Sequence, residues 1–172
     1  DEYIGAEIPG APGHVYEEIL LKDRQGKLLP RVDGAIPLDV THPVWKQQVQ
    51  KTLEEFVRQG FDYVKLDFLS HGGMEGAHYD RECMTGRQAL MKGYEFLAEQ
   101  LSEEKAGRPV FLSLSIAPLF PQGMGHARRF SCDAFGTAED TEYVLNALTY
   151  AWWQSGTLYC YNDPDHISLY RS

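Results

Sequence analysis

The sequence is short of positive charge. Its 172 residues carry 16 Lys and Arg against 25 Asp and Glu, which gives a net charge of -9. Nucleic acids and anionic membrane surfaces are bound mainly through clusters of Lys and Arg, and no such cluster offsets the acidic balance. We therefore expect no nucleic acid and no membrane as partners. The balance fits an enzyme that acts on a neutral small molecule.

Cysteines and long apolar runs are also scarce. The three cysteines, Cys83, Cys132 and Cys160, lack metal-type spacing, and their odd number indicates free buried thiols rather than a disulfide framework. No stretch approaches the roughly 18 apolar residues of a membrane span. No glycine-rich nucleotide loop opens a predicted helix. The chain opens with Asp1 and without a signal peptide, which suggests a processed or excised piece and leaves localisation open.

The most informative stretch is a predicted strand that carries charge. Residues 63–68, YVKLDF, form a near-continuous apolar run of β-formers, typical of a parallel strand covered on both faces. Lys65 and Asp67 are two residues apart and therefore share one side of the strand. The pair is either a structural ion pair or an active-site carboxylate with its lysine at the C-terminal mouth of a parallel barrel.

Strands and helices alternate along most of the chain. Residues 1–34 are rich in Gly and Pro and predict a hairpin around residues 23–26, whereas residues 35–172 form a β/α segment. Thr41 is expected to cap the first helix, which Gly60 ends, and Thr137 with Asp140 is expected to cap the last. The expected strands are 35–40, 63–68, 111–116, 130–135 and 158–161, and the expected helices are 41–59, 81–104, 124–129 and 137–154, the last with Leu145, Leu148 and Trp152 on its buried face.

Polar residues follow nearly every predicted strand. They are Asp39, Lys65 with Asp67, Ser115, Asp133, and Asn162 with Asp163 and Asp165. Such residues at the C-terminal ends of strands are typical of a TIM-type barrel, although an open doubly wound sheet uses the same edge. A full barrel needs at least about 200 residues. The chain is therefore either a segment of a barrel or an open sheet.

Two carboxylates at neighbouring strand ends are the minimum for glycoside hydrolysis. Asp67, beside Lys65, is expected to stay ionised as a nucleophile must. Asp133 stands between Phe130 and Phe135, an aromatic setting that favours the neutral form of an acid. The alternative role for Asp133 is a turn or helix cap near residue 137.

The glycine-rich loop after Asp67 contains two histidines, and such loops often carry function. His71 is expected to line the pocket, with a solvated loop as the alternative. A metal site made of His71, His78 and Asp67 lacks the usual ligand spacing, so we expect no metal.

Three motifs occur in order: KLD at 65–67, RFSCD at 129–133 and YNDPD at 161–165. Together with LDVTHP at 38–43, they resemble the retaining α-galactosidases of glycoside hydrolase families 27 and 36. The resemblance spans roughly residues 35–167. It implies a (β/α)8 barrel of which this chain holds about strands 3 to 7, no metal or cofactor, and double displacement through a glycosyl-aspartate on Asp67, with Asp133 as acid/base.

The resemblance also assigns the surrounding residues. It implies that Lys65 and Arg129 bind the sugar, although the adjacent Arg128 could be the inward arginine instead. Ser115 is close to the position that reads the 2-substituent of the sugar. The family often has Glu or Ser there, and in this chain Ile116 falls near the place of that Glu. Further expected substrate contacts are Asp39 and His71, and the expected structural residues near the site are Asn162, Asp163 and Asp165.

The expected activity is hydrolysis of terminal α-galactosides or related α-glycosides, with an α-linked carbohydrate as substrate. The alternatives are a non-catalytic carbohydrate-binding or degenerate barrel fragment and a metal-dependent barrel hydrolase. Because a partial barrel leaves strand edges open, a second copy of the chain or the remainder of a larger chain is expected to pair with them.

Overall fold

The computed structural model describes residues 3–120 and 124–165. They form two compact units that alternate along the sequence: the first comprises residues 3–62 and 69–110, and the second residues 63–68, 111–120 and 124–165. The division predicted from the sequence, 1–34 against 35–172, is a different one and stays a prediction.

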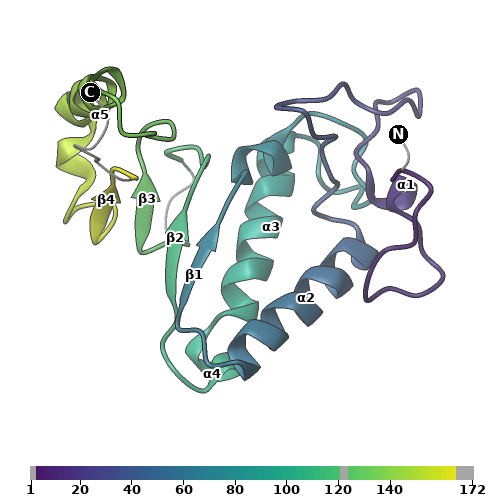
Figure 1. The fold of residues 1–172 in the computed structure, drawn as a ribbon. Helices are drawn as coiled ribbons and strands as arrows, with labels where there is room; N and C mark the ends of the chain where they lie inside the picture. Colours follow the sequence, from purple (N-terminus) through teal and green to yellow (C-terminus); the bar gives the residue numbers. More distant parts are fainter. Residues whose placement is uncertain (1–2, 121–123, 166–172) are drawn as a thin grey trace. The chain divides into compact units, whose positions relative to one another are not determined.

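The second unit is built on a four-stranded parallel sheet, in which the strands lie side by side in chain order (Figure 1). Lys65 pairs with Ser113, Ser113 with Ala127, and Ala127 with Tyr161 across the sheet. The parallel α/β class predicted from the sequence is confirmed, whereas the described residues form an open sheet of four strands. The strands are β1 (Tyr63–Leu66), β2 (Phe111–Leu114), β3 (Ala127–Arg129) and β4 (Tyr161–Asp163).

One face of this sheet carries an aromatic row. The ring of Phe111 stacks on Tyr63 at 5.4 Å and on Tyr161 at 5.6 Å between centroids. Tyr63 remains 49% exposed, whereas Val64, on the opposite face of β1, is buried. The expectation that β1 is covered on both faces is therefore wrong: the face shared by Tyr63 and Lys65 is open.

Strand β3 lies earlier in the chain than the sequence indicated. The predicted helix over 124–129 and the predicted strand over 130–135 are both wrong, because residues 127–129 form the strand and a loop follows it. Ala127 is fully buried between its two neighbouring strands. A Cβ atom at Gly125 would lie 2.4 Å from Leu114 Cγ, so only a glycine permits this close approach. Small residues thus bring β3 into the sheet.

The last helix of the second unit is α5 (Ala138–Ala151), followed by the 3-10 turn η2 (Trp152–Gln154). Thr137 caps it, and Asp140 completes the capping box, as predicted. Its buried face was predicted wrongly. Val144 and Ala151 are buried, whereas Leu145, Leu148 and Trp152 are 54%, 37% and 67% exposed. Apolar residues occur around the whole helix, so periodicity alone does not select the packed side.

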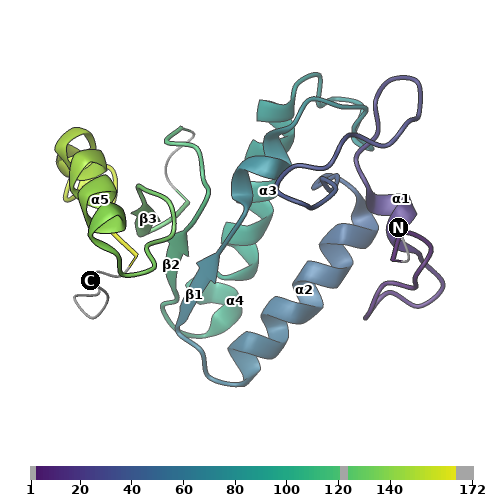
Figure 2. The ribbon, with the colours of Figure 1, turned by 45° about the horizontal axis from the view of Figure 1, so that its top comes forward.

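The first unit is mainly helical. Helices α2 and α3 lie side by side in both views (Figures 1 and 2). A core of Ile8, Ala11, Ile19, Val44 and Trp45 ties the N-terminal segment to the start of α2. The helices are α1 (Tyr16–Ile19), α2 (Pro43–Arg58), the 3-10 helix η1 (Leu69–Gly73), α3 (Gly86–Gln100) and α4 (Glu103–Ala106).

The N-terminal segment differs from the predicted hairpin. Its first half contains α1, because the side chain of Glu18 accepts a hydrogen bond from Val15 N and starts a helical turn. The turn itself forms, with Asp23 accepting from the backbone of Gln25 and Lys27, but one antiparallel bridge between Lys22 and Leu28 replaces a strand pair.

Three further features differ from expectation. Residues 35–40 are not a regular strand, since Pro37 offers no N–H and only isolated bridges form there. His42, rather than Thr41, caps α2 by accepting from Val44 N. Helix α3 begins at Gly86, later than predicted, because Thr85 and Gln88 form its capping box.

Candidate active site

The guanidinium of Arg129 is the centre of the candidate site. Arg129 ends β3, and its side chain is only 5% exposed. Its Nη2 donates a hydrogen bond to Oδ1 of Asp133, in the loop that follows β3. Its Nη1 lies 3.1 Å from Oδ1 of Asp165, which follows β4. Since β3 and β4 are parallel neighbours, these carboxylates meet at the C-terminal edge of the sheet.

A third carboxylate acts on the same guanidinium. Burial opposes the charged form of Arg129, but the hydrogen bond to Asp133 and the charges of Asp133, Asp165 and Asp67 outweigh it and raise the pKa of Arg129. Asp67 and Asp133, the two residues predicted to carry the chemistry, thus both lie within electrostatic reach of one buried cation.

The Lys65–Asp67 pair has the geometry that the sequence predicted. Lys65 Nζ lies 3.8 Å from Asp67 Oδ2, and the two side chains are 43% and 39% exposed. Asp67 Oδ1 also accepts a hydrogen bond of 2.8 Å from Phe68 N. A pair this exposed contributes about 1 kcal/mol or less to stability, so its side chains remain available to a ligand.

Backbone strain gathers at these strand ends. Four non-glycine residues of the described chain have positive φ, and three of them, Phe68, Ile116 and Asp165, follow β1, β2 and β4. Such conformations are uncommon outside glycine and concentrate at functional sites. Nothing in the sequence marks Phe68 or Ile116 as strained.

Asp133 does not have the aromatic setting that the sequence suggested. Its side chain is 59% exposed and paired with Arg129, and Phe135 is 68% exposed. Arg128, the other arginine considered for the site, instead donates from Nε and Nη2 to the carbonyl of Ala117.

Strand β2 places two buried hydroxyls between the charged strands. Ser115 N donates to Leu66 O at 2.8 Å, and Ser113 pairs with Lys65 in register. Both serines are essentially fully buried, and within the described chain their Oγ atoms have no hydrogen-bond partner. These hydroxyls are therefore polar groups whose partners are not among the described side chains.

Asp39 belongs to the first unit, where it joins two loop segments. Its Oδ1 accepts from Thr41 N and Oγ1 at 3.0 and 2.7 Å and lies 3.4 Å from His78 Nδ1, while its Oδ2 accepts from Tyr79 N at 2.6 Å. Burial opposes the charged form, but these hydrogen bonds prevail and lower the pKa of Asp39. Its contact with a substrate stays a prediction.

The remaining predicted residues have local partners. His71 Nε2 lies 3.4 Å from Asp33 Oδ2 in the first unit. Asn162 Nδ2 donates to Ala151 O at 2.7 Å, and Asp163 Oδ1 accepts from Asp165 N at 2.8 Å. No group of three or more His, Cys, Asp or Glu side chains suited to a metal occurs in residues 3–120 and 124–165. Within the same residues, no helix has the length and apolar character needed to cross a membrane.

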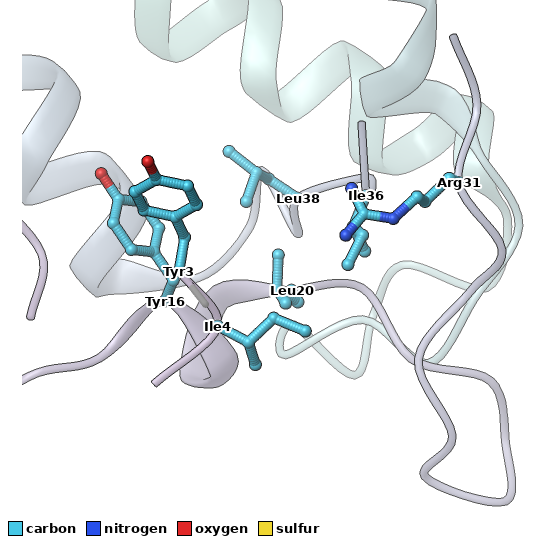
Figure 3. A pocket seen from close by; sticks show the side chains of 7 residues that line it. All are labelled: Tyr3, Ile4, Tyr16, Leu20, Arg31, Ile36 and Leu38. Carbon is cyan, nitrogen blue, oxygen red and sulfur yellow. The ribbon is translucent and has the colours of Figure 1, made fainter. Parts of the chain in front are cut away.

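A separate cavity of about 320 Å³ lies in the first unit (Figure 3). Its lining is mostly apolar, and Arg31, Tyr3 and Tyr16 are the lining residues whose side chains carry polar groups. Glycoside hydrolysis needs paired carboxylates, and none is among these lining residues. The lining residues are Tyr3, Ile4, Tyr16, Leu20, Arg31, Ile36 and Leu38.

Comparison with solved structures finds partial likeness to an α-galactosidase from Thermus thermophilus. Its complex with p-nitrophenyl α-D-galactopyranoside matches at a TM-score of 0.64 and 21% identity, over 87% of this chain and 32% of that one. Its complex with stachyose matches at 0.60 and 21%, over 87% and 34%. The chain thus spans about a third of the solved chains, and the likeness shows a shared fold. No protein-family model and no curated protein matches the sequence.

Proposed function

We propose that this chain forms the catalytic part of a retaining glycoside hydrolase that cleaves terminal α-galactosides or related α-glycosides. The observation that carries the proposal is the hydrogen bond of Asp133 to the buried Arg129 at the C-terminal edge of a parallel sheet, where the charge of Asp67 acts on the same guanidinium. A partial fold likeness to an α-galactosidase supports it. The motifs that resemble families 27 and 36 contain the same residues.

In the proposed first step, a carboxylate oxygen of Asp67 attacks the anomeric carbon while Asp133 gives its proton to the leaving glycosidic oxygen. The C–O bond to the leaving group breaks, and a glycosyl ester forms on Asp67. In the second step Asp133 removes a proton from water, the water oxygen attacks the anomeric carbon, and Asp67 leaves as a carboxylate. The two inversions retain the anomeric configuration.

The cations have distinct places in this scheme. Lys65 is exposed enough to donate to a sugar hydroxyl, and its ammonium lies 3.8 Å from the Asp67 carboxylate. Arg129 is buried and binds Asp133, so it supports the acid/base and offers charge to the sugar. Ser115 and Ser113 provide hydroxyls on the intervening strand. The scheme uses no metal or cofactor.

The test is hydrolysis of a panel of nitrophenyl α-glycosides by the 172-residue chain and by any longer chain that contains it. We expect release from the α-galactoside, with the α-anomer as the first product seen by proton NMR. Asp67→Asn should lower kcat at least about a thousandfold, because the nucleophile is lost. Asp62→Asn, an exposed change of the same charge just before β1, is the matched control.

The results separate the candidate functions. Full activity of Asp67→Asn contradicts its role as nucleophile, and a β-anomer as first product contradicts retention. Binding of α-galactosides without turnover favours the non-catalytic carbohydrate-binding alternative. Loss of activity on adding a chelator favours a metal-dependent hydrolase. Activity of the longer chain alone would show that the chemistry is right and that further strands complete the site.

A further inference from the structure

We infer that Asp165 is a positioning residue that holds the acid/base Asp133 in place. The inference rests on the proposed function and deepens it. It assigns a role to Asp165, which the sequence predicted only as a structural residue near the site. Asp165 has no assigned contact with substrate.

The carboxylate of Asp165 joins two points on either side of Asp133. Its Oδ1 lies 3.1 Å from Arg129 Nη1, at the end of β3. Its Oδ2 accepts a hydrogen bond of 2.8 Å from the backbone N–H of Ala134, the residue directly after Asp133. Asp133 therefore lies in a short loop that one carboxylate fixes at both ends.

Asp165 is itself held. Its side chain is only 20% exposed, and its N–H donates to Oδ1 of Asp163 at 2.8 Å. Its φ of 68° is a left-handed conformation that residues other than glycine seldom adopt. These contacts keep the carboxylate pointing at the β3 loop, and strained backbone of this kind persists where surrounding contacts require it.

Asp165 also changes the electrostatics of Asp133. Arg129, at the end of β3, pairs with both Asp133 and Asp165. The charge of Asp67 acts on the same guanidinium, and Lys65 lies beside Asp67. One positive charge is thus shared among several carboxylates. Asp165 therefore competes with Asp133 for the same guanidinium.

The kinetic test compares substrates with good and poor leaving groups. A dinitrophenyl leaving group departs without a proton, whereas the alcohol of a disaccharide needs one from Asp133. We expect Asp165→Asn to lower kcat/KM for a galactosyl disaccharide at least tenfold and to change glycosylation by the dinitrophenyl galactoside less than threefold. Glu142→Gln, an exposed change of the same charge on α5, should change neither value.

A purely structural role predicts another pattern. Equal losses on both substrates would overturn the inference. Should Asp165→Asn fail to fold by circular dichroism, Asp163→Ala, which removes the acceptor for Asp165 N, tests the same support more mildly. It should give a smaller loss with the same leaving-group dependence.

A second measurement is independent of turnover. In hydrogen exchange followed by NMR, Asp165→Asn should speed exchange at the Ala134 amide at least tenfold, while the amide of Leu112 in β2 keeps its rate. Unchanged protection at Ala134 would overturn the inference whether or not the chain is an enzyme. Absence of turnover both in the 172-residue chain and in a longer chain that contains it would instead overturn the proposed function.

Discussion

The ammonium of Lys65 lies 3.8 Å from the carboxylate of Asp67 on the open face of β1. Both side chains are well over a third exposed, so the pair contributes about 1 kcal/mol or less to the free energy of unfolding. A structural ion pair and a catalytic pair therefore make different predictions at this position.

We predict that Lys65→Met lowers kcat/KM for an α-galactoside at least tenfold and leaves the free energy of unfolding within about 1 kcal/mol of its original value. The reason is that the ammonium acts on the substrate and on Asp67 rather than on the fold. The measurements are steady-state kinetics and urea denaturation. Lys27→Met, in the exposed turn of the N-terminal segment, is the control. A stability loss with unchanged kinetics would identify a structural ion pair.

The sequence predicted β1 and the placement of its charges because strand periodicity is local information. The same holds for the capping box of α5, where Thr137 and Asp140 suffice. The prediction from sequence failed at β3. The strand there depends on Gly125 and Ala127 fitting beside β2, which is a tertiary property. The prediction also failed on the packed face of α5, where apolar residues surround the helix.

The candidate site was predictable in part for the same reason. Motif spacing singled out Asp67, Arg129 and Asp133, and the structure brings their charges together. Other features of the site depend on residues far apart in the chain. Examples are the hydrogen bond from Ala134 N to Asp165 and the contact of Asp39 with His78. The positive φ of Phe68 was not predicted either. For the segment after β4, there is one local signal in the sequence: the Asp-Pro-Asp run at 163–165 predicts a turn.

The buried Asp39 cluster predicts a pH-dependent stability. The pKa of Asp39 is lower in the folded chain, so its ionised form stabilises the fold above about pH 4, the value in an unfolded chain, and this contribution is lost as the pH falls below it. Asp39→Asn should therefore lower the free energy of unfolding by about 1–3 kcal/mol at pH 7, since it leaves buried donors unpaired.

Urea denaturation between pH 7 and pH 3 measures this effect. The difference between Asp39→Asn and the original protein should shrink as the pH falls through 4. A difference that stays constant with pH would contradict the assignment of the effect to the Asp39 charge. Asp62→Asn, at an exposed position, should show no comparable difference.

At the start of α3, replacing a glycine with alanine is expected to destabilise the fold. A Cβ atom at Gly86 would lie 2.0 Å from the carbonyl oxygen of Gly73 and 2.6 Å from its carbon, so backbone rather than a flexible side chain blocks it. Gly86→Ala should lower the free energy of unfolding by about 1–3 kcal/mol or more, because the helix start must separate from the end of η1. At Gly5, where nothing lies within 4 Å of an added Cβ, alanine should be tolerated. Equal thermal melting of the two variants would contradict this packing.

The aromatic row on the sheet contains a tyrosine, Tyr161, whose pKa is raised. A hydrogen bond with Tyr63, together with burial and nearby negative groups, raises the pKa of Tyr161 to about 12. Because the bond favours the neutral phenol, Tyr63→Phe should lower the titration midpoint of Tyr161 toward the ordinary value of about 10. NMR of ¹³Cζ-labelled tyrosine measures the midpoint, with Tyr161→Phe assigning the signal. Tyr150→Phe, at an 82% exposed position, should leave the midpoint unchanged. A midpoint that Tyr63→Phe does not move would show that burial and charge, rather than the partner hydroxyl, hold the proton on Tyr161.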